Sequence, residues 1–393
     1  MKASAIRELL KLTEQPDVIS FAGGLPSPDV FPVEKFQSAC QSVLAKDGLM
    51  ALQYGTTEGF KSLRDRIAGY LERYGINTRS ENILITSGSQ QALDLIGKTF
   101  IDPGDRVLME KPTYVGALQA WNAYQSNFVG VPIDADGMRI DVLRDTLALG
   151  GKLIYAMPNF QNPAGVTLSK ERRRVLVEIA EEYDVLLIED DPYGQLRYDG
   201  EHLPPLFSLD GENVVYLSTF SKILSPGLRL GWMIASPDII DRLIQAKQGT
   251  DLHTSTLIQM IAAEIIAGEF LDKQVQLIRS VYRDRRNVML SAMKEYFPSN
   301  VTWTSPQGGL FLWVTLPPSL DSKEVLREAL KKKVAFVPGE AFYADGSGAN
   351  NLRLNFSYSK PAIIEEGIRR LGQVIYFMLS NSPQPIESAE VKS

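Results

Sequence analysis

VVYLSTFSKILSPGLRLGWMIA occupies residues 214–235 and guides the interpretation of the rest of this chain. It begins with an apolar run at residues 214–217, which is typical of a buried strand, and it ends with a second apolar run at residues 230–235. Lys222 stands between the two runs, so we do not expect it to be an ordinary solvated surface charge. A lysine in such a setting is suited to forming a Schiff base with a carbonyl cofactor.

Hydroxyl groups and one arginine flank this lysine. Ser218, Thr219 and Ser221 precede it closely, and Arg229 follows seven residues after Lys222. These groups would hold an anion such as a phosphate, because hydrogen bonds that involve a charged group are strong. The alternative for this stretch alone is a lysine at a strand end, with its ammonium group in water and the hydroxyls bonded to the turn backbone.

Composition is that of an ordinary globular protein. The 393 residues are 44% hydrophobic and 22% charged, and the formal net charge is -6, so neither nucleic acid nor an anionic membrane is expected as the main partner. No apolar stretch is long enough for a transmembrane helix, and residues 1–8 lack the apolar core of a signal peptide. The only cysteine is Cys40 and the only histidines are His202 and His253, so an internal disulfide or a cysteine- or histidine-based metal site is not expected. We therefore expect a cytoplasmic chain.

Strand-like and helix-like segments alternate from residue 83 onward. The main expected strands are 83–86, 106–110, 152–157, 185–190 and 214–218. The main expected helices are 87–100, 169–183, 237–247 and 270–296. This alternation predicts an α/β fold, in which ligand-binding groups collect at the carboxyl ends of the strands.

Two of these strands end in groups suited to a ligand. Ser87-Gly88-Ser89-Gln90 lies between a strand and a helix, and small residues before a helix N-terminus make an anion site. The segment lacks the glycine-lysine pair of a nucleotide-binding P-loop, and no G-x-G-x-x-G follows an early strand, so a dinucleotide is not expected. Glu189, Asp190 and Asp191 end another strand. Buried acids are costly unless paired or used, and a magnesium site is one interpretation of them.

Three further segments carry candidate binding residues. Gly24 lies in an irregular Gly-Gly-Leu-Pro segment, where bare backbone N–H groups are available to a ligand. Ser4 and Arg7 belong to an amphipathic helix expected at residues 4–13. Arg353 alternates with two leucines on an expected strand, so its side chain faces away from theirs.

Together these segments resemble those of fold-type I, pyridoxal-phosphate-dependent aminotransferases. F-S-K-x-L-S-P-G-L-R around Lys222, D-x-x-Y from Asp190 and N-x-L-R-L-x-F around Arg353 are similar to motifs of that family. F-A-G-G-L-P, S-Q-Q-A-L-D and Q-G-x-D-L-H add a resemblance to the branch of 2-aminoadipate, kynurenine and aromatic or branched-chain aminotransferases. The resemblance extends from residue 4 to about residue 379.

The resemblance implies which residues hold pyridoxal 5′-phosphate. Lys222 would bind it covalently, and Asp190 would pair with the protonated pyridine nitrogen. Tyr193 and Asn162 would contact the phenolic oxygen, and Tyr114 would stack on the ring. The implied phosphate contacts are Ser89, Gln90, Thr219, Ser221 and Arg229, together with Tyr54, which would reach across a dimer to the partner's cofactor.

The resemblance also implies how a substrate is held. Arg353 would bind the α-carboxylate through its planar guanidinium, beside Gly24 and Asn162. Ser4 and Arg7 would receive an acidic side chain such as that of 2-aminoadipate. The alternative for Arg7 is an exposed arginine on an amphipathic helix, and the apolar neighbours on that helix would accept leucine or aromatic side chains.

The fold that the resemblance implies is the α/β fold of pyridoxal-phosphate-dependent transferases. A large domain would contain a central mixed, mostly parallel seven-stranded sheet, and a small α+β domain would be built from both chain ends. The expected division is an N-terminal arm at 1–40, a large cofactor-binding domain at 41–275, a small domain at 276–380 and a flexible tail at 381–393. The functional unit would be a homodimer with shared active sites.

The implied activity is ping-pong transamination between an L-amino acid (2-aminoadipate, leucine or an aromatic one) and a 2-oxo acid such as 2-oxoglutarate. Lys222 would move the α-proton as a base. Decarboxylases and C–S lyases use related scaffolds, so they remain alternatives. A regulatory sensor is a further one, although neither a preceding DNA-binding domain nor a basic patch is expected here. No metal is expected in the aminotransferase interpretation.

Overall fold

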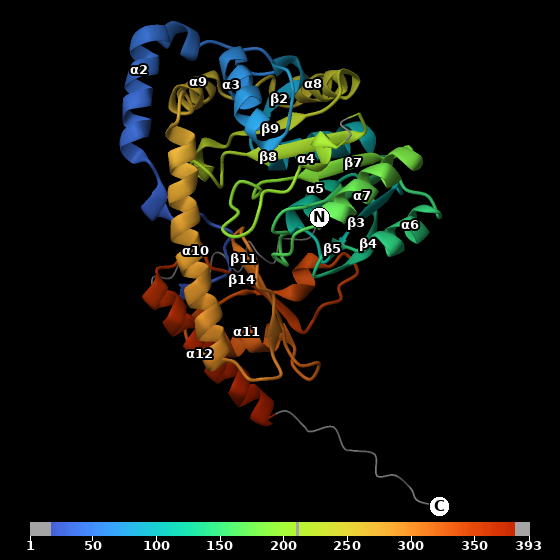
Figure 1. Ribbon diagram of the computed structural model, residues 1–393, viewed down its shortest axis with the longest axis vertical. Helices are drawn as coiled ribbons and strands as arrows, with labels where there is room; N and C mark the ends of the chain where they lie inside the picture. Colours follow the sequence, from blue (N-terminus) through green and yellow to red (C-terminus); the bar gives the residue numbers. More distant parts are fainter. Residues whose placement is uncertain (1–16, 210–211, 382–393) are drawn as a thin grey trace, which may run out of the picture.

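A computed structural model describes residues 17–209 and 212–381, and its centre is an eight-stranded mixed sheet (Figure 1). The strand order is β2-β9-β8-β7-β6-β3-β4-β5. Neighbours from β8 to β4 are parallel, whereas β9 is antiparallel to both of its neighbours and β5 is antiparallel to β4. The strands are β2 (Ile83–Thr86), β3 (Arg106–Lys111), β4 (Asn127–Asp134), β5 (Gly137–Met138), β6 (Leu153–Ala156), β7 (Leu186–Asp190), β8 (Val214–Thr219) and β9 (Gly231–Ile234).

The predicted central, mixed and mostly parallel sheet is confirmed, with one strand more than the seven expected. The additional strand is β5, a two-residue strand that pairs with the end of β4 at the sheet edge. The sequence patterns above predict neither β4 nor β5. Because β4 lies near the edge and most of its residues are not buried, it lacks the continuous apolar run that marks the inner strands.

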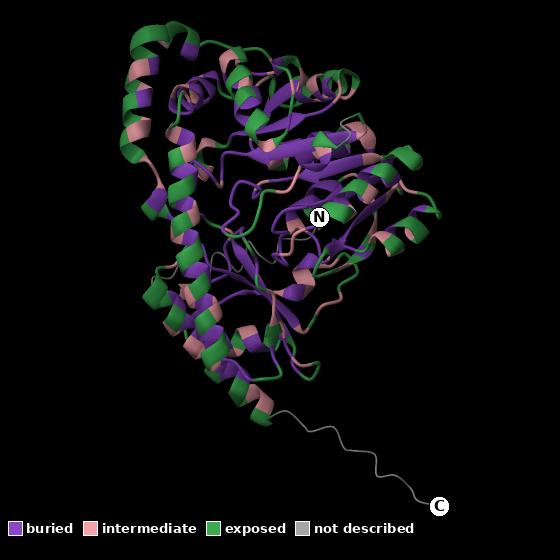
Figure 2. Ribbon diagram, viewed as in Figure 1, coloured by how far each residue is buried: buried purple, intermediate pink, exposed green. Residues whose placement is uncertain are grey.

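Helices surround the sheet, and each has residues exposed to solvent, whereas most of the inner strands are buried (Figure 2). Among these helices, α4 packs against α5 and α8, and α9 packs against α2 and α3. Ser169 caps α7 as its position predicts, since its hydroxyl accepts the Arg172 N–H. The helices are α2 (Val33–Ala51), α3 (Lys61–Leu71), α4 (Ser89–Phe100), α5 (Val115–Asn122), α6 (Ile140–Leu147), α7 (Lys170–Glu182), α8 (Pro237–Asp251), α9 (Thr256–Ile265), α10 (Phe270–Tyr296), α11 (Ser322–Lys331) and α12 (Pro361–Asn381).

The long helix α10 runs along one side of the molecule. A smaller antiparallel sheet lies near the end of α10 that is farther from the large sheet (Figure 1). Its order is β10-β11-β14-β13, and α12 packs along α10 beside it. A separate parallel pair joins β1 to β12. These strands are β1 (Ile19–Ser20), β10 (Thr302–Trp303), β11 (Phe311–Thr315), β12 (Val334–Ala335), β13 (Val337–Pro338) and β14 (Asn351–Asn355).

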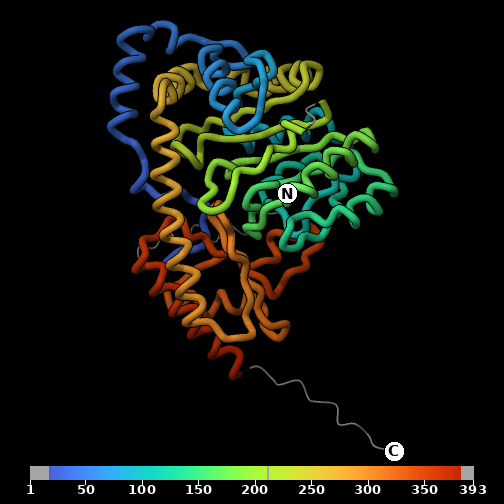
Figure 3. The backbone as a smooth tube through the Cα atoms, in the orientation of Figure 1, coloured from blue at the N-terminus to red at the C-terminus, as the bar shows by residue number. Residues whose placement is uncertain are grey.

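Segments from both ends of the sequence meet in this smaller part, as expected. The carbonyl of Phe21 accepts the Asn355 N–H at 2.9 Å, and the Phe21 N–H donates to Ala335 at 2.8 Å. In the tube drawing the N-terminal segment after residue 17 passes beside the C-terminal strands (Figure 3). The predicted domain boundaries at 40/41 and 275/276 fall inside the helices α2 and α10, and the division at those residues stays a prediction.

Two sequence-based expectations fall outside the described residues. The helix at 4–13, with Ser4 and Arg7, lies in the undescribed segment before residue 17, and so does nearly all of the tail at 381–393. Among the helices of residues 17–209 and 212–381, none combines the length and apolar character needed to cross a membrane.

The topology brings one end of several strands to the same edge of the large sheet. Strands β2, β3, β6, β7 and β8 run in the same direction, so the residues that follow them lie along one edge. Strands β11 and β14 of the smaller sheet face this edge (Figure 1). The cleft between the two sheets therefore collects side chains from both parts of the chain.

Candidate active site

A cavity of about 390 Å³ lies at this edge, the size range of a small-molecule site. It brings together twelve of the fifteen residues that the sequence predicts for the site. They are Gly24, Ser89, Gln90, Tyr114, Asn162, Asp190, Tyr193, Thr219, Ser221, Lys222, Arg229 and Arg353. Of the other three, Tyr54 lies outside the cavity, and Ser4 and Arg7 fall in the undescribed N-terminal segment.

Lys222 follows β8 and lines the cavity. Its Nζ donates a hydrogen bond to the Gly24 carbonyl at 2.8 Å. Burial, with help from the positive charges of Arg353 and Arg229, lowers the pKa of the Lys222 amine from 10.5 to about 8. A larger share of this amine is therefore unprotonated near neutral pH than for a surface lysine, which makes it a better nucleophile and base.

Asp190, the last residue of β7, presents one satisfied and one unsatisfied oxygen. Its side chain is buried, at 1% exposure, and Oδ2 accepts the Tyr155 hydroxyl at 2.7 Å. Oδ1 is also buried and has no hydrogen-bond partner in the described chain. Burial raises the pKa of Asp190 to about 7. A buried carboxylate oxygen of this kind is costly without a donor, so it fits a ligand that brings an N–H group, as a protonated pyridine does.

The neighbouring acids of Asp190 serve the fold. Both oxygens of Glu189 accept backbone N–H groups at 2.9 Å. Asp191 accepts the Asn159 amide at 2.9 Å and the Gly194 N–H at 2.8 Å. Within residues 17–209 and 212–381, no group of three or more His, Cys, Asp or Glu side chains is placed to hold a metal ion. The geometry thus provides no site for the magnesium interpretation.

An anion site lies at the start of α4. As the first residues of a helix, Ser89 and Gln90 have backbone N–H groups without intrahelical acceptors. Arg229 reaches the same turn, with its Nη2 3.4 Å from the Ser87 carbonyl oxygen. The hydroxyls of Thr219 and Ser221 lie 2.9 Å apart on the adjoining loop and line the same cavity. A guanidinium, helix N–H groups and hydroxyls form the set of donors that binds phosphate.

Arg353 lies on β14 between two aromatic rings. Its guanidinium carbon is 4.1 Å from the ring centre of Phe311 and 4.9 Å from that of Phe342. One Nη donates to the Asn162 side-chain oxygen at 2.8 Å, the other donates to the Ala22 carbonyl at 2.7 Å, and Nε is buried without a partner. The stacked, fixed guanidinium is suited to a carboxylate ligand.

Two tyrosines form the walls of the cavity. The ring of Tyr114 covers Gly116 closely, since a β-carbon at Gly116 would lie 2.4 Å from the ring. Burial raises the pKa of the Tyr114 hydroxyl to about 12, so it stays protonated. Tyr193 is buried and packs edge-on against Phe311, with ring centres 6.0 Å apart.

Three residues that shape the cavity are missed by the sequence interpretation. Tyr155 orients Asp190, and Phe311 and Phe342 sandwich Arg353. Tyr155 carries a weak signal, because it places a hydroxyl within the apolar strand β6. The two phenylalanines carry none, because a buried aromatic residue, whether on a strand as Phe311 or on a short 3-10 helix as Phe342, is normally core.

Tyr54 is not brought to the cavity of its own chain. Its side chain is 79% exposed and contacts His253 edge-on, with ring centres 5.7 Å apart. The role predicted for it in a partner's site stays a prediction.

Comparison with protein families identifies the family to which this chain belongs. The family model "Aminotransferase class I and II" matches residues 16–371. The chain belongs to this family. The protein is therefore an aminotransferase, and its cofactor is pyridoxal 5′-phosphate.

Relatives of this aminotransferase cover almost its whole length. Aromatic-amino-acid aminotransferase 1 of Thermococcus litoralis is 50% identical over 383 residues, which are 95% of this chain and 92% of the relative. The structure of Pyrococcus horikoshii kynurenine aminotransferase, in complex with PMP and kynurenine, has a TM-score of 0.93 at 49% identity and 96% coverage of both chains. The α-aminoadipate aminotransferase of Thermus thermophilus, complexed with N-(5′-phosphopyridoxyl)-L-leucine, has a TM-score of 0.91 at 41% identity, again with 96% coverage of both.

Proposed function

We propose that this aminotransferase transfers the amino group of an aromatic amino acid, 2-aminoadipate or leucine to a 2-oxo acid, with 2-oxoglutarate as the acceptor. The observation that carries the proposal is one cavity that holds a nucleophilic lysine, an unpaired buried carboxylate oxygen and a stacked arginine: Lys222, Asp190 and Arg353. The substrate classes come from the three relatives, which include an aromatic, a kynurenine and an α-aminoadipate aminotransferase.

The proposed cofactor contacts follow the geometry of the cavity. Lys222 would hold the cofactor covalently, and Oδ1 of Asp190 would accept its ring N–H. Tyr114 would pack against the ring, and Asn162 and Tyr193 would contact the phenolic oxygen. The start of α4 and Arg229 would hold the phosphate, with the donors Ser89, Gln90, Thr219 and Ser221. When bound, pyridoxal phosphate supplies an electron sink for a carbanion at the substrate α-carbon.

Residues of this chain then direct which bond breaks. Arg353 binds the α-carboxylate and keeps it out of the reacting position, so the Cα–H bond is the one exposed to the base. Lys222, once free, takes that proton, because its pKa of about 8 leaves it partly unprotonated near neutral pH. The Gly24 carbonyl, 2.8 Å from Nζ, holds the amine on the substrate side of the cavity. This arrangement favours transamination over decarboxylation.

Selection of the substrate side chain is proposed to involve the N-terminal segment. Gly24 lines the cavity, and Ser4 and Arg7 are the residues proposed to bind an acidic side chain. An apolar helix face would accept leucine, the amino acid in the ligand of the Thermus thermophilus structure.

We also propose a cytoplasmic homodimer. Leu49, Leu52 and Tyr54 are 93%, 73% and 79% exposed around the end of α2, and Leu252 is exposed close by. Several large apolar side chains exposed in one region are typical of an interface. A second copy seated there would cover it and would place Tyr54 at the partner's phosphate site.

The test is a half-reaction assay on the purified, cofactor-loaded protein. Each amino acid of a panel is added without an acceptor, and pyridoxamine phosphate and the 2-oxo acid are quantified together. Equal amounts of both from phenylalanine, kynurenine, 2-aminoadipate or leucine would support the proposal. Release of carbon dioxide or a thiol, with the cofactor recovered as the aldehyde, would contradict it.

A further inference from the structure

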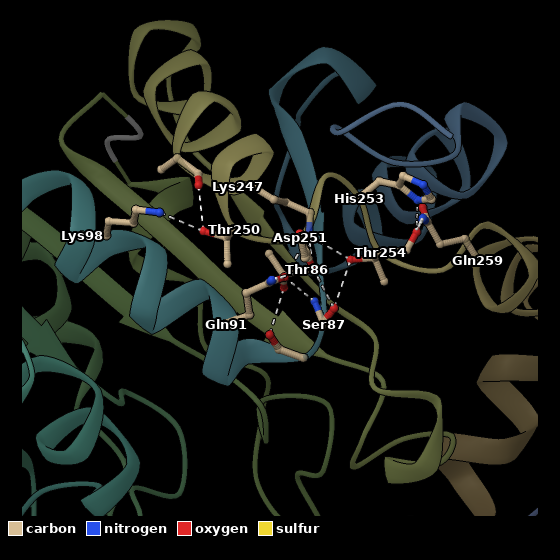
Figure 4. Close-up of polar contacts among 12 residues, drawn as sticks. Thr86, Ser87, Gln91, Lys98, Lys247, Thr250, Asp251, His253, Thr254 and Gln259 are labelled. Atoms are coloured by element: carbon tan, nitrogen blue, oxygen red, sulfur yellow. Dashed lines mark hydrogen bonds and ion pairs between the residues drawn. The ribbon is translucent and has the colours of Figure 1, made fainter. Parts of the chain in front are cut away.

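A buried lysine that the proposed function does not use lies behind the phosphate turn. Lys247, on α8, has a fully buried side chain. Its Nζ donates to Oδ1 of Asp251 at 2.8 Å, to Oε1 of Gln91 at 2.9 Å and to the Thr254 hydroxyl at 3.1 Å. Figure 4 shows these acceptors gathered where the end of α8 meets the start of α4.

Gln91 connects this ammonium group to the turn that precedes α4. Its Oε1, held by Lys247, accepts the Ser87 N–H at 2.8 Å, and its Nε2 donates to Oδ2 of Asp251 at 2.7 Å (Figure 4). The carbonyl of Ser87 in turn accepts the Arg229 guanidinium at 3.4 Å. The hydrogen bonds that start at Lys247 therefore reach the Ser87 backbone and, through it, Arg229 of the anion site.

The same corner of the chain holds the loop that carries Tyr54. His253 follows the network acid Asp251 by two residues, and its Nε2 accepts the Gly55 N–H at 3.2 Å while its ring contacts Tyr54. Residues 251–254 thus connect the turn of this chain's own phosphate site with the tyrosine proposed for the partner's site.

A role in fold stability alone does not explain why a lysine occupies this position. Burial opposes its charge and lowers the pKa of Lys247, while the Asp251 carboxylate raises it. Well-packed apolar side chains often stabilise a fold as well as such a pair does. A buried cation with three fixed acceptors instead specifies geometry, since each acceptor must keep its place.

We propose that Lys247 is a positioning residue for the cofactor phosphate. Through Gln91 and Asp251 it holds the Ser87–Ser89 turn in the conformation in which the helix N–H groups and Arg229 point at one anion. The inference rests on the proposed function, because it requires that the phosphate binds at the start of α4.

The test compares two ligands that differ only in the phosphate. Apoenzyme is titrated with pyridoxal 5′-phosphate and with pyridoxal, and Kd is measured for the wild type, Lys247→Met and the control Lys98→Met. Lys98 is exposed and donates to Thr250 at 3.1 Å at the same corner, without contacting Gln91. Lys247→Met should raise the Kd for pyridoxal phosphate about tenfold, the cost of disrupting a charged hydrogen-bond network, and leave that for pyridoxal unchanged. Lys98→Met should change neither.

A second variant keeps the test decisive if Lys247→Met does not fold. Gln91→Met removes the acceptor of the Ser87 N–H and leaves the Lys247–Asp251 pair intact, at a half-buried site; it should give the same phosphate-selective loss. The inference would be overturned if both variants lost affinity equally for the two ligands, or lost none. If the wild type still bound pyridoxal phosphate more tightly than pyridoxal, the proposed function would stand. A wild type that binds neither ligand would overturn the proposed function as well.

Discussion

At the scale of the residue, the cavity is defined by polar atoms whose partners are incomplete. Oδ1 of Asp190 and Nε of Arg353 are both buried without a hydrogen bond, although their other polar atoms are satisfied. Buried polar groups are nearly always paired in folded proteins. Two such exceptions in one cavity, one an acceptor and one a donor, indicate a ligand that supplies both a donor and an acceptor.

The unpaired oxygen of Asp190 leads to the first prediction. Asp190→Asn removes the negative charge that would keep the cofactor ring protonated, so kcat for transamination should fall about 100-fold, the typical effect of losing one such electrostatic contact. Tyr155→Phe is the matched control, because it removes the neighbouring donor and keeps the carboxylate; its loss should be clearly smaller. Equal losses would mean that Asp190 acts only through packing.

The lowered pKa of Lys222 leads to the second prediction. The amine must lose its proton before it attacks an aldehyde, and its pKa is about 8. The rate at which apoenzyme captures pyridoxal phosphate should therefore rise with pH, reach half its maximum near pH 8 and level off above it. Arg353→Met removes one of the charges that depress this pKa, so the midpoint should move to higher pH. A wild-type midpoint near 10.5 would show that the amine is unperturbed.

At the scale of the element, the phosphate turn depends on the close approach of β9 to the start of α4. Gly231 begins β9, and a β-carbon there would lie 2.8 Å from the Gly88 carbonyl carbon and from the Ser89 nitrogen. These are backbone atoms and cannot rotate away. The glycine therefore allows an antiparallel strand to pass directly beneath the turn.

Gly231→Ala should consequently displace the turn. We expect a lower thermal midpoint and a Kd for pyridoxal phosphate that rises by about tenfold or more, because overpacking against backbone costs roughly 1–3 kcal/mol. Gly69→Ala, in α3, is the control: a β-carbon there meets nothing within 4 Å. That change should raise the thermal midpoint slightly, since alanine favours helix. Calorimetry and cofactor titration of both variants provide the measurement.

At the scale of the whole molecule, two sheets joined by α10 form the cleft, and apolar side chains are exposed around the end of α2. The cavity needs both parts, because Lys222 and Asp190 come from the large sheet and Arg353 from the small one. The exposed leucines at the end of α2 lie outside this cleft. In the proposed homodimer, the partner would cover these leucines and would receive Tyr54 at its phosphate site.

Leu52→Glu should therefore weaken both assembly and cofactor binding. A charge in an apolar interface should shift the protein to monomers in size-exclusion chromatography with light scattering, and the Kd for pyridoxal phosphate should rise because Tyr54 is withdrawn. Leu149→Glu is the matched control, with a leucine that is 74% exposed beyond α6, on the other side of the molecule. A Leu52→Glu protein that stays dimeric would place the interface elsewhere.

Local sequence is sufficient for the inner strands, for helices such as α4, α7 and α10, and for the residue types of the site. The run before Lys222, the acids after β7 and the small residues before α4 each follow from short-range patterns, because apolar periodicity and turn chemistry act within a few residues. The half-exposed strand β4, next to the sheet edge, escapes this reasoning because it lacks a continuous apolar run. The family resemblance supplied the roles that the patterns alone left open.

Tertiary structure alone decides which atoms remain unpaired and which charges shift. Nothing near Asp190 in the sequence reveals that Tyr155 satisfies one oxygen and leaves the other free, or that two phenylalanines enclose Arg353. Likewise, the hydrogen bond from Lys247 to Gln91 joins residues 156 positions apart. Burial and hydrogen bonding depend on distance in space, and only the folded chain brings these groups together.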